Sequence, residues 1–98
     1  MLFRSKTFKK YKKYSRKLVY KTDNVIKGEV WFTPSILIEE IPQITMNGYF
    51  VNNLCVLKKY RRTGIGRKLM NHLIHIAKKE QMMHLILQVE TRKDYLVE

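Results

Sequence analysis

The residues best suited to bind a ligand lie in one short stretch, where basic side chains surround two glycines. It reads Arg61-Arg62-Thr63-Gly64-Ile65-Gly66-Arg67-Lys68. Glycine leaves the backbone approachable, because no Cβ stands in front of its N–H group. Cationic side chains on both sides would add charge-assisted hydrogen bonds to an anion. We therefore expect this glycine loop (residues 61–68) to hold a phosphate or polyphosphate.

An apolar run precedes the glycine loop and a helical pattern follows it. Leu54-Cys55-Val56-Leu57 is typical of a strand. From residue 64 to 80, apolar residues recur at spacings of three and four, at Ile65, Leu69, Leu73, Ile76 and Ala77. A strand, a glycine turn and a helix together direct backbone N–H groups and the positive end of the helix dipole at one point. The competing interpretation is a glycine turn into a basic helix with no ligand.

Other strands are predicted around this unit. Turn residues Thr22-Asp23-Asn24 separate two apolar segments and indicate a hairpin, and Gly28 in its second strand would allow a close backbone approach or a bulge. The long strand before the loop alternates regularly and is apolar on both faces, so we expect it to be central and covered on each side. The predicted strands are residues 18–20, 25–32, 49–57 and 84–90.

The composition indicates one small, basic domain of 98 residues with a net charge of +12. Such a charge favours polyanionic partners but does not choose among them. Residues 1–17 contain eight basic and no acidic residues, with aromatic residues between them, and we treat them as a basic N-terminal segment before a domain at 18–98. Three interpretations of this segment stay open: a partly helical stretch with packed aromatics, an arm that touches nucleic acid or membrane phosphates, or a mitochondrial presequence.

Cys55 is the only cysteine, which excludes an internal disulfide and fits a reducing compartment. We therefore expect an intracellular, cytoplasmic protein, with a nuclear location as the alternative. No apolar run approaches the roughly 20 residues of a membrane span, so no transmembrane segment is expected. His72 and His75 lie three residues apart, but no cysteine or acidic ligand accompanies them on that face, so no metal is expected.

Residues 53–70 resemble the acetyl-CoA signature of the GNAT superfamily of N-acetyltransferases, Arg/Gln-x-x-Gly-x-Gly/Ala after a hydrophobic strand. The fixed positions of this signature fall on Arg61, Gly64 and Gly66, and Leu54-Cys55-Val56 matches the family's Leu-x-Val strand. The resemblance covers residues 18–90 and implies an α/β fold with a mixed sheet, in which an antiparallel hairpin leads into strand, glycine loop, helix and parallel strand. The elements that follow in the family are not found before residue 98, so we expect the C-terminal elements to be missing.

The resemblance also implies acetyl-CoA as the co-substrate. Its pantetheine arm would lie along the backbone of the strand before the loop, where two family strands splay apart, and its pyrophosphate would lie on the N–H groups of the loop. The cofactor-binding residues implied in this way are Leu54, Cys55, Val56, Leu57, Arg61, Arg62, Thr63, Gly64, Ile65, Gly66, Arg67 and Lys68.

By the same resemblance, the reaction would transfer an acetyl group to a primary amine of an acceptor that the sequence does not identify. Many relatives carry a catalytic Glu on the strand before the loop, where this chain has Asn52 and Asn53. Glu90 is then the candidate general base and Tyr95 the candidate general acid for the leaving thiolate. The alternatives are an impaired or truncated acetyl-CoA-binding domain and a basic nucleic-acid-binding module. An exposed sheet edge would favour a homodimer.

Overall fold

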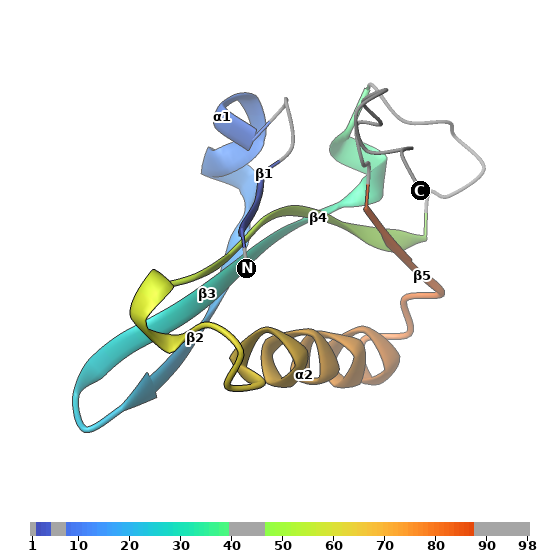
Figure 1. Cartoon of the computed structure of the whole chain (residues 1–98). Helices are drawn as coiled ribbons and strands as arrows, with labels where there is room; N and C mark the ends of the chain where they lie inside the picture. Colours follow the sequence, from blue (N-terminus) through green and yellow to red (C-terminus); the bar gives the residue numbers. More distant parts are fainter. Residues whose placement is uncertain (1, 5–7, 40–46, 88–98) are drawn as a thin grey trace, which may run out of the picture.

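The computed structural model describes residues 2–4, 8–39 and 47–87. These residues form a five-stranded sheet with one long helix on one face and short helical turns on the other (Figure 1). The strands are β1 Leu2–Arg4, β2 Arg16–Thr22, β3 Val25–Pro34, β4 Gly48–Val56 and β5 His84–Ile86. The α-helices are α1 Phe8–Tyr11 and α2 Ile65–Lys79, and 3₁₀ turns are η1 Lys12–Tyr14, η2 Ser35–Leu37 and η4 Lys58–Tyr60. The predicted mixed α/β class is confirmed.

The predicted hairpin is formed by β2 and β3, and both strands run further than their sequence patterns indicated. Asp23 and Asn24 connect them with φ angles of 52° and 61°. Two successive residues with positive φ are the geometry of a type I′ turn, which matches the twist of the flanking strands. This short turn sets the pairing of Thr22 with Val25 and of Lys21 with Ile26. A bulge at Lys27 then shifts the register, so that Tyr20 pairs with Gly28, which lies beneath the first turns of α2.

Strand β4 is central, as predicted. Strand β3 pairs antiparallel with it along one edge, from Tyr49 to Val56. The opposite edge is shared by two short strands: β5 runs parallel beside Gly48–Phe50, and β1 runs antiparallel beside Asn53–Cys55 (Figure 1). On this second edge, β5 therefore pairs with the start of β4, and β1 pairs with a stretch closer to its end.

The regular alternation predicted for residues 49–57 is wrong at one point, because β4 contains a β-bulge. Trp31 of β3 pairs with Asn53 while Phe32 pairs with Val51, which leaves Asn52 as an extra residue on β4. An extra residue reverses the facing of every side chain beyond it. Side chains on both sides of the bulge consequently join one core beneath α2, namely Tyr49, Val51, Leu54 and Val56.

Helix α2 begins and ends one residue inside the predicted limits of 64 and 80. Its apolar stripe packs on the sheet, and Leu73 at its centre has no exposed surface. Because a fully buried leucine contacts core residues on all sides, it reports directly on how well the helix is packed. Within the described residues, neither α2 nor α1 is both long and apolar enough to cross a membrane.

The N-terminal basic segment is partly helical, and two of its aromatic side chains are packed into the protein. Phe8 is buried with its ring edge-on to Trp31, with centroids 5.5 Å apart. Tyr11 is buried with Ile38 and Phe50 on the face of the sheet opposite α2. Tyr14 differs, since 53% of its surface is exposed. Of the three interpretations, packed aromatics describe Phe8 and Tyr11.

Candidate cofactor-binding site

The connection from β4 to α2 is a tight turn that depends on two residues with positive φ. Arg62 has φ 66° and Gly64 has φ 84°. Arg61 fixes the start of this turn, because its Nε donates a hydrogen bond of 2.9 Å to the carbonyl oxygen of Val56. Thr63 Oγ1 donates to the carbonyl oxygen of Tyr60 and closes the turn on itself. The conformation of the loop is thus held by its own side chains and does not require a bound ligand.

The first turn of α2 presents backbone donors that the helix itself does not use. Gly64 is the N-cap and supplies no side chain to cap the helix. The first intrahelical bond runs from the N–H of Lys68 to the carbonyl oxygen of Gly64, at 3.0 Å. The N–H groups of Ile65, Gly66 and Arg67 therefore have no acceptor within the helix. Together with the helix dipole they form a site that favours an anion.

An open pocket of about 340 Å³ lies against these N–H groups. The pocket brings together much of the predicted cofactor set, and it is lined by Val56, Tyr60, Arg61, Arg62, Gly64, Ile65, Gly66 and Arg67. Apart from the adjoining residues of the chain, no described atom lies within 4 Å of the position that a Cβ on Gly64 would take. The glycine is required here by its left-handed backbone rather than by crowding.

The structure separates some predicted residues from this pocket and adds one. Leu54, Cys55, Leu57, Thr63 and Lys68 do not line it. The amine of Lys68 instead lies 5.5 Å from the ring centre of Tyr20, above β2. Tyr60 lines the pocket although it was not among the candidates, and its signal in the sequence was its place directly before Arg61. Lys27 lies 4.8 Å from the ring centre of Tyr60.

The backbone of β4 offers alternate peptide groups to its two edges. The N–H of Leu57, directly after β4, donates to the carbonyl oxygen of Lys27 in β3, so the peptide groups of Leu57 face the edge that pairs with β3. Because peptide groups alternate along a strand, those of Leu54 and Val56 point to the other edge. The bond from Arg61 to the Val56 carbonyl agrees with this direction. On this second edge, β4 pairs with β5 from Gly48 to Phe50 within the described residues.

Buried amides occupy the part of β4 where many relatives place a glutamate. The Asn52 side chain has no exposed surface, and its Nδ2 donates to Ser15 Oγ at 2.7 Å and to Thr33 Oγ1. The Oδ1 atoms of Asn52 and Asn53 are buried and have no hydrogen-bond partner in the described part of the chain. Both proposed catalytic residues, Glu90 and Tyr95, lie outside the described residues.

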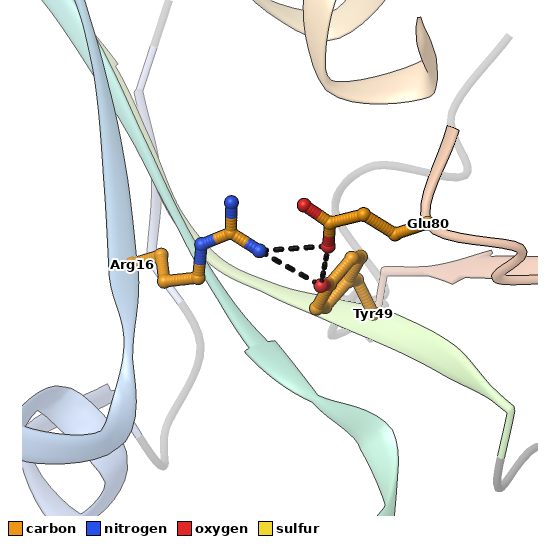
Figure 2. Close-up of polar contacts among 3 residues, drawn as sticks. All are labelled: Arg16, Tyr49 and Glu80. Atoms are coloured by element: carbon orange, nitrogen blue, oxygen red, sulfur yellow. Dashed lines mark hydrogen bonds and ion pairs between the residues drawn. The ribbon is translucent and has the colours of Figure 1, made fainter. Parts of the chain in front are cut away.

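A second polar cluster lies at the other end of α2, and sequence reasoning missed it (Figure 2). Nη1 of Arg16, at the start of β2, donates to Tyr49 Oη at 2.9 Å and to Glu80 Oε1 at 2.8 Å. Tyr49 Oη also donates to Glu80 Oε1. These bonds join two strands to the residue that follows α2, so the cluster fixes the C-terminal end of the helix.

The titration of this cluster follows from its contacts. The hydrogen bond from Arg16, followed by that from Tyr49, lowers the pKa of Glu80 below that of a free carboxyl. Burial of Tyr49, assisted by its bond to the carboxylate, raises the pKa of its phenol. The cluster is therefore formed by ionised Glu80, neutral Tyr49 and charged Arg16 near neutral pH.

No group of three or more His, Cys, Asp or Glu side chains in the described ranges is placed to hold a metal ion. The rings of His72 and His75 lie 6.2 Å apart on the exposed face of α2. Two histidines without a third ligand do not make a structural metal site.

Known proteins share this fold. The family model described as the acetyltransferase (GNAT) family matches residues 6–96. An integron cassette protein from V. cholerae is similar, with a TM-score of 0.64 and 22% identity over 79% of this chain and 45% of its own. A ribosomal-protein-alanine N-acetyltransferase from Brucella melitensis has a TM-score of 0.64 and 19% identity over 85% and 56%. A predicted acetyltransferase from Clostridium acetobutylicum, solved with acetyl-CoA, has a TM-score of 0.60 and 16% identity over 93% and 64%.

No curated protein matches the sequence. The chain spans about half the length of the first solved structures that it matches, with shares of 45% and 46%. At identities near 20% these structures establish the fold alone. The family model, by contrast, matches nearly the whole sequence. On that match, and with the strand, glycine loop and helix arranged as described, the chain belongs to the acetyltransferase (GNAT) family.

Proposed function

We propose that this chain binds acetyl-CoA through the glycine loop and the first turn of α2, as part of an N-acetyltransferase that acts on a primary amine. One observation carries the proposal. Three backbone N–H groups without an intrahelical acceptor open onto a 340 Å³ pocket that Arg61, Arg62 and Arg67 also line. A diphosphate matches this site in both charge and hydrogen-bonding demand, because it has several acceptor oxygens and no donor.

The residues of the loop would have different roles in binding. Gly64 keeps its left-handed conformation and turns the N–H groups of residues 65–67 into the pocket. Arg61, Arg62 and Arg67 are all exposed. Arg62 and Arg67 would supply charge to the outer phosphate oxygens, whereas the guanidinium of Arg61 is hydrogen-bonded to Val56 and holds the loop in place. Because all three arginines are exposed, the affinity should fall as ionic strength rises.

Acetyl-CoA supplies an activated acyl group as a thioester. The chain would have to align that thioester with a neutral amine and exclude competing water, since positioning accounts for much of the rate of such a transfer. Attack by the amine nitrogen on the acetyl carbon forms the C–N bond and releases the thiolate, while the amine gives up a proton. Glu90 as the base that accepts this proton, and Tyr95 as the acid that protonates the thiolate, remain proposals from the family resemblance.

Calorimetric titration with acetyl-CoA tests the site. The wild type should bind, and the double variant Gly64→Glu, Gly66→Glu should not, because two carboxylates would stand at the phosphate position. Lys79→Glu is the matched control, since it makes the same change of net charge at the far, exposed end of α2. Arg67→Ala is a milder second variant on the exposed helix surface and should weaken binding severalfold.

Two outcomes of the titration would contradict the proposal. Absence of heat from the wild type at millimolar acetyl-CoA would refute cofactor binding. Equal affinity in the wild type and the double glycine variant would place the cofactor elsewhere.

Nucleic-acid binding and homodimer formation stay predictions from charge and sheet edges. Among the described basic residues, Lys12 and Lys17 lie 5.3 Å and 5.1 Å from the ring centre of Trp31, and no contact of theirs favours a nucleic acid over another anion. Binding to a DNA duplex that falls steeply with salt would support the first prediction. Sedimentation equilibrium would test the second.

A further inference from the structure

Strand β1 lies on the edge of β4 where the cofactor arm is expected. Its register places Leu2 opposite Cys55, Phe3 opposite Leu54 and Arg4 opposite Asn53. In the described part of the chain, β5 pairs with the same edge from Gly48 to Phe50, and β1 pairs with the stretch beyond it (Figure 1). A segment from the start of the chain therefore occupies the edge of β4 at Asn53–Cys55.

Three of the peptide groups on this edge of β4 already have partners, namely both groups of Leu54 and the carbonyl of Val56. The alternation set by Leu57 and Lys27 directs the N–H and C=O of Leu54 at β1, and Phe3 is the residue opposite. In an antiparallel ladder, two opposed residues of this kind exchange both of their hydrogen bonds. The next outward carbonyl, that of Val56, accepts from Arg61. Both peptide groups of Leu54 and the carbonyl of Val56 are thus engaged within the chain.

We infer that β1 is a self-inhibitory strand, which must leave the edge of β4 before the extended arm of acetyl-CoA can lie there. This inference rests on the proposed function, because it concerns the same cofactor. The physical reason is exclusion: one edge of a strand pairs with one neighbour at a time, so an arm that hydrogen-bonds to Leu54 and β1 compete for the same two groups.

The construction of β1 makes it suited to release. It is three residues long, and it pairs only with β4 in the described sheet. Its end is held near α1 by Arg4, whose guanidinium lies 5.4 Å from the ring centre of Phe8 and whose side chain is exposed. Short edge elements with solvent-exposed ladders open at low free energy, well before global unfolding. Released β1 would stay tethered close to its site.

The effect on affinity follows from the fraction of molecules in which the edge is free. The apparent dissociation constant equals the intrinsic one divided by that fraction. With a minor open state of about 1–10%, loss of β1 should tighten acetyl-CoA binding by about 10- to 100-fold. A ligand that touches only the glycine loop should bind equally well with β1 present or lost. The two ligand classes therefore separate this inference from the proposed function.

The experiment compares the wild type with Phe3→Pro and uses two ligands. Proline has no N–H, so this variant removes the donor that faces the carbonyl oxygen of Leu54. Phe3→Ala is the matched control, because it loses the same side chain but keeps the N–H. The ligands are acetyl-CoA and 3′-phosphoadenosine 5′-diphosphate, which keeps the diphosphate of CoA and lacks the pantetheine arm.

We expect Phe3→Pro to bind acetyl-CoA at least tenfold more tightly than Phe3→Ala does, and both variants to bind the nucleotide with equal affinity. Equal acetyl-CoA affinities in the two variants, with the nucleotide bound by both, would overturn the self-inhibitory strand and leave the proposed function standing. Failure of the wild type and both variants to bind the nucleotide would instead refute the proposed function, and the inference with it.

Hydrogen exchange in the wild type gives a second test that needs no variant. The N–H of Phe3 should be protected in the free protein and in the nucleotide complex, and it should exchange faster once acetyl-CoA is bound. Protection that persists in the saturated acetyl-CoA complex would show that β1 and the cofactor coexist, which would overturn the inference.

Discussion

The close approach of α2 to the sheet at Gly28 gives a quantitative test of how the helix is positioned. A Cβ at residue 28 would lie 3.0 Å from Ile65 Cγ2, 3.1 Å from the carbonyl oxygen of Cys55 and 3.2 Å from Leu69 Cδ1. The two side-chain ends can shift slightly, but the carbonyl belongs to the ladder between β3 and β4 and cannot. Gly28→Ala therefore overpacks this contact. The free energy of unfolding should fall by about 1–3 kcal/mol.

In a domain of this size each kcal/mol changes Tm by about 4–8 °C, so Gly28→Ala should melt about 4–24 °C below the wild type. Circular dichroism during heating and in urea measures both quantities. Ile65→Leu removes the Cγ2 branch and is the partner variant for a double-mutant cycle. The double variant should lose less stability than the sum of the single losses, with a coupling above about 0.5 kcal/mol. A melting temperature for Gly28→Ala within about 2 °C of the wild type would refute the close contact.

Three further predictions concern the core and the polar clusters. Leu73→Ala removes a side chain with no exposed surface, so the urea-derived free energy of unfolding should drop by about 2–5 kcal/mol; a loss below about 1 kcal/mol would contradict its central packing. Asn52→Ala removes donors to Ser15 and Thr33 and should cost about 1–3 kcal/mol by the same assay, and no loss would argue against the network. Because the pKa of Glu80 is lowered in the folded protein, its ionised form stabilises the fold above the usual carboxyl pKa, and this stability is lost as pH falls through the folded pKa. Glu80→Gln should thus flatten the dependence of Tm on pH below about pH 5, and an unchanged slope would contradict it.

The parts of the fold that the sequence predicted are those specified by neighbouring residues. The apolar stripe of α2 has a helical period, and Gly64 marks the helix start because its φ of 84° disfavours other residues. The β2–β3 turn was recognisable because Asp23 and Asn24 are among the residues that tolerate positive φ. In these cases the local preference and the final fold agree, so pattern alone was enough.

The parts that escaped prediction depend on residues far apart in the chain. The bulge at Asn52 is defined by the register with β3, and alternation within β4 carries no trace of it. The cluster of Arg16, Tyr49 and Glu80 joins residues separated by 33 and 31 positions. Strand β1 is short and lies in a strongly basic part of the sequence, which does not indicate a strand. It is a strand because it pairs with the distant residues 53–55 of β4. The spacing of residues within one helix or strand cannot predict contacts between residues so far apart in the sequence.

The two ends of α2 are held by different contacts, so a substitution at one end can change stability without changing ligand affinity. Its 15 residues span about 22 Å, with the Gly28 contact and the N–H groups at one end and the Arg16 cluster at the other. A change at Glu80 should lower stability while nucleotide affinity stays within about twofold, since the donors lie a full helix length away. Gly28→Ala should lower both, because it pushes against Ile65, whose N–H is one of the donors. If Glu80→Gln weakened nucleotide binding as much as Gly28→Ala did, the anion site would depend on the whole helix rather than on its first turn.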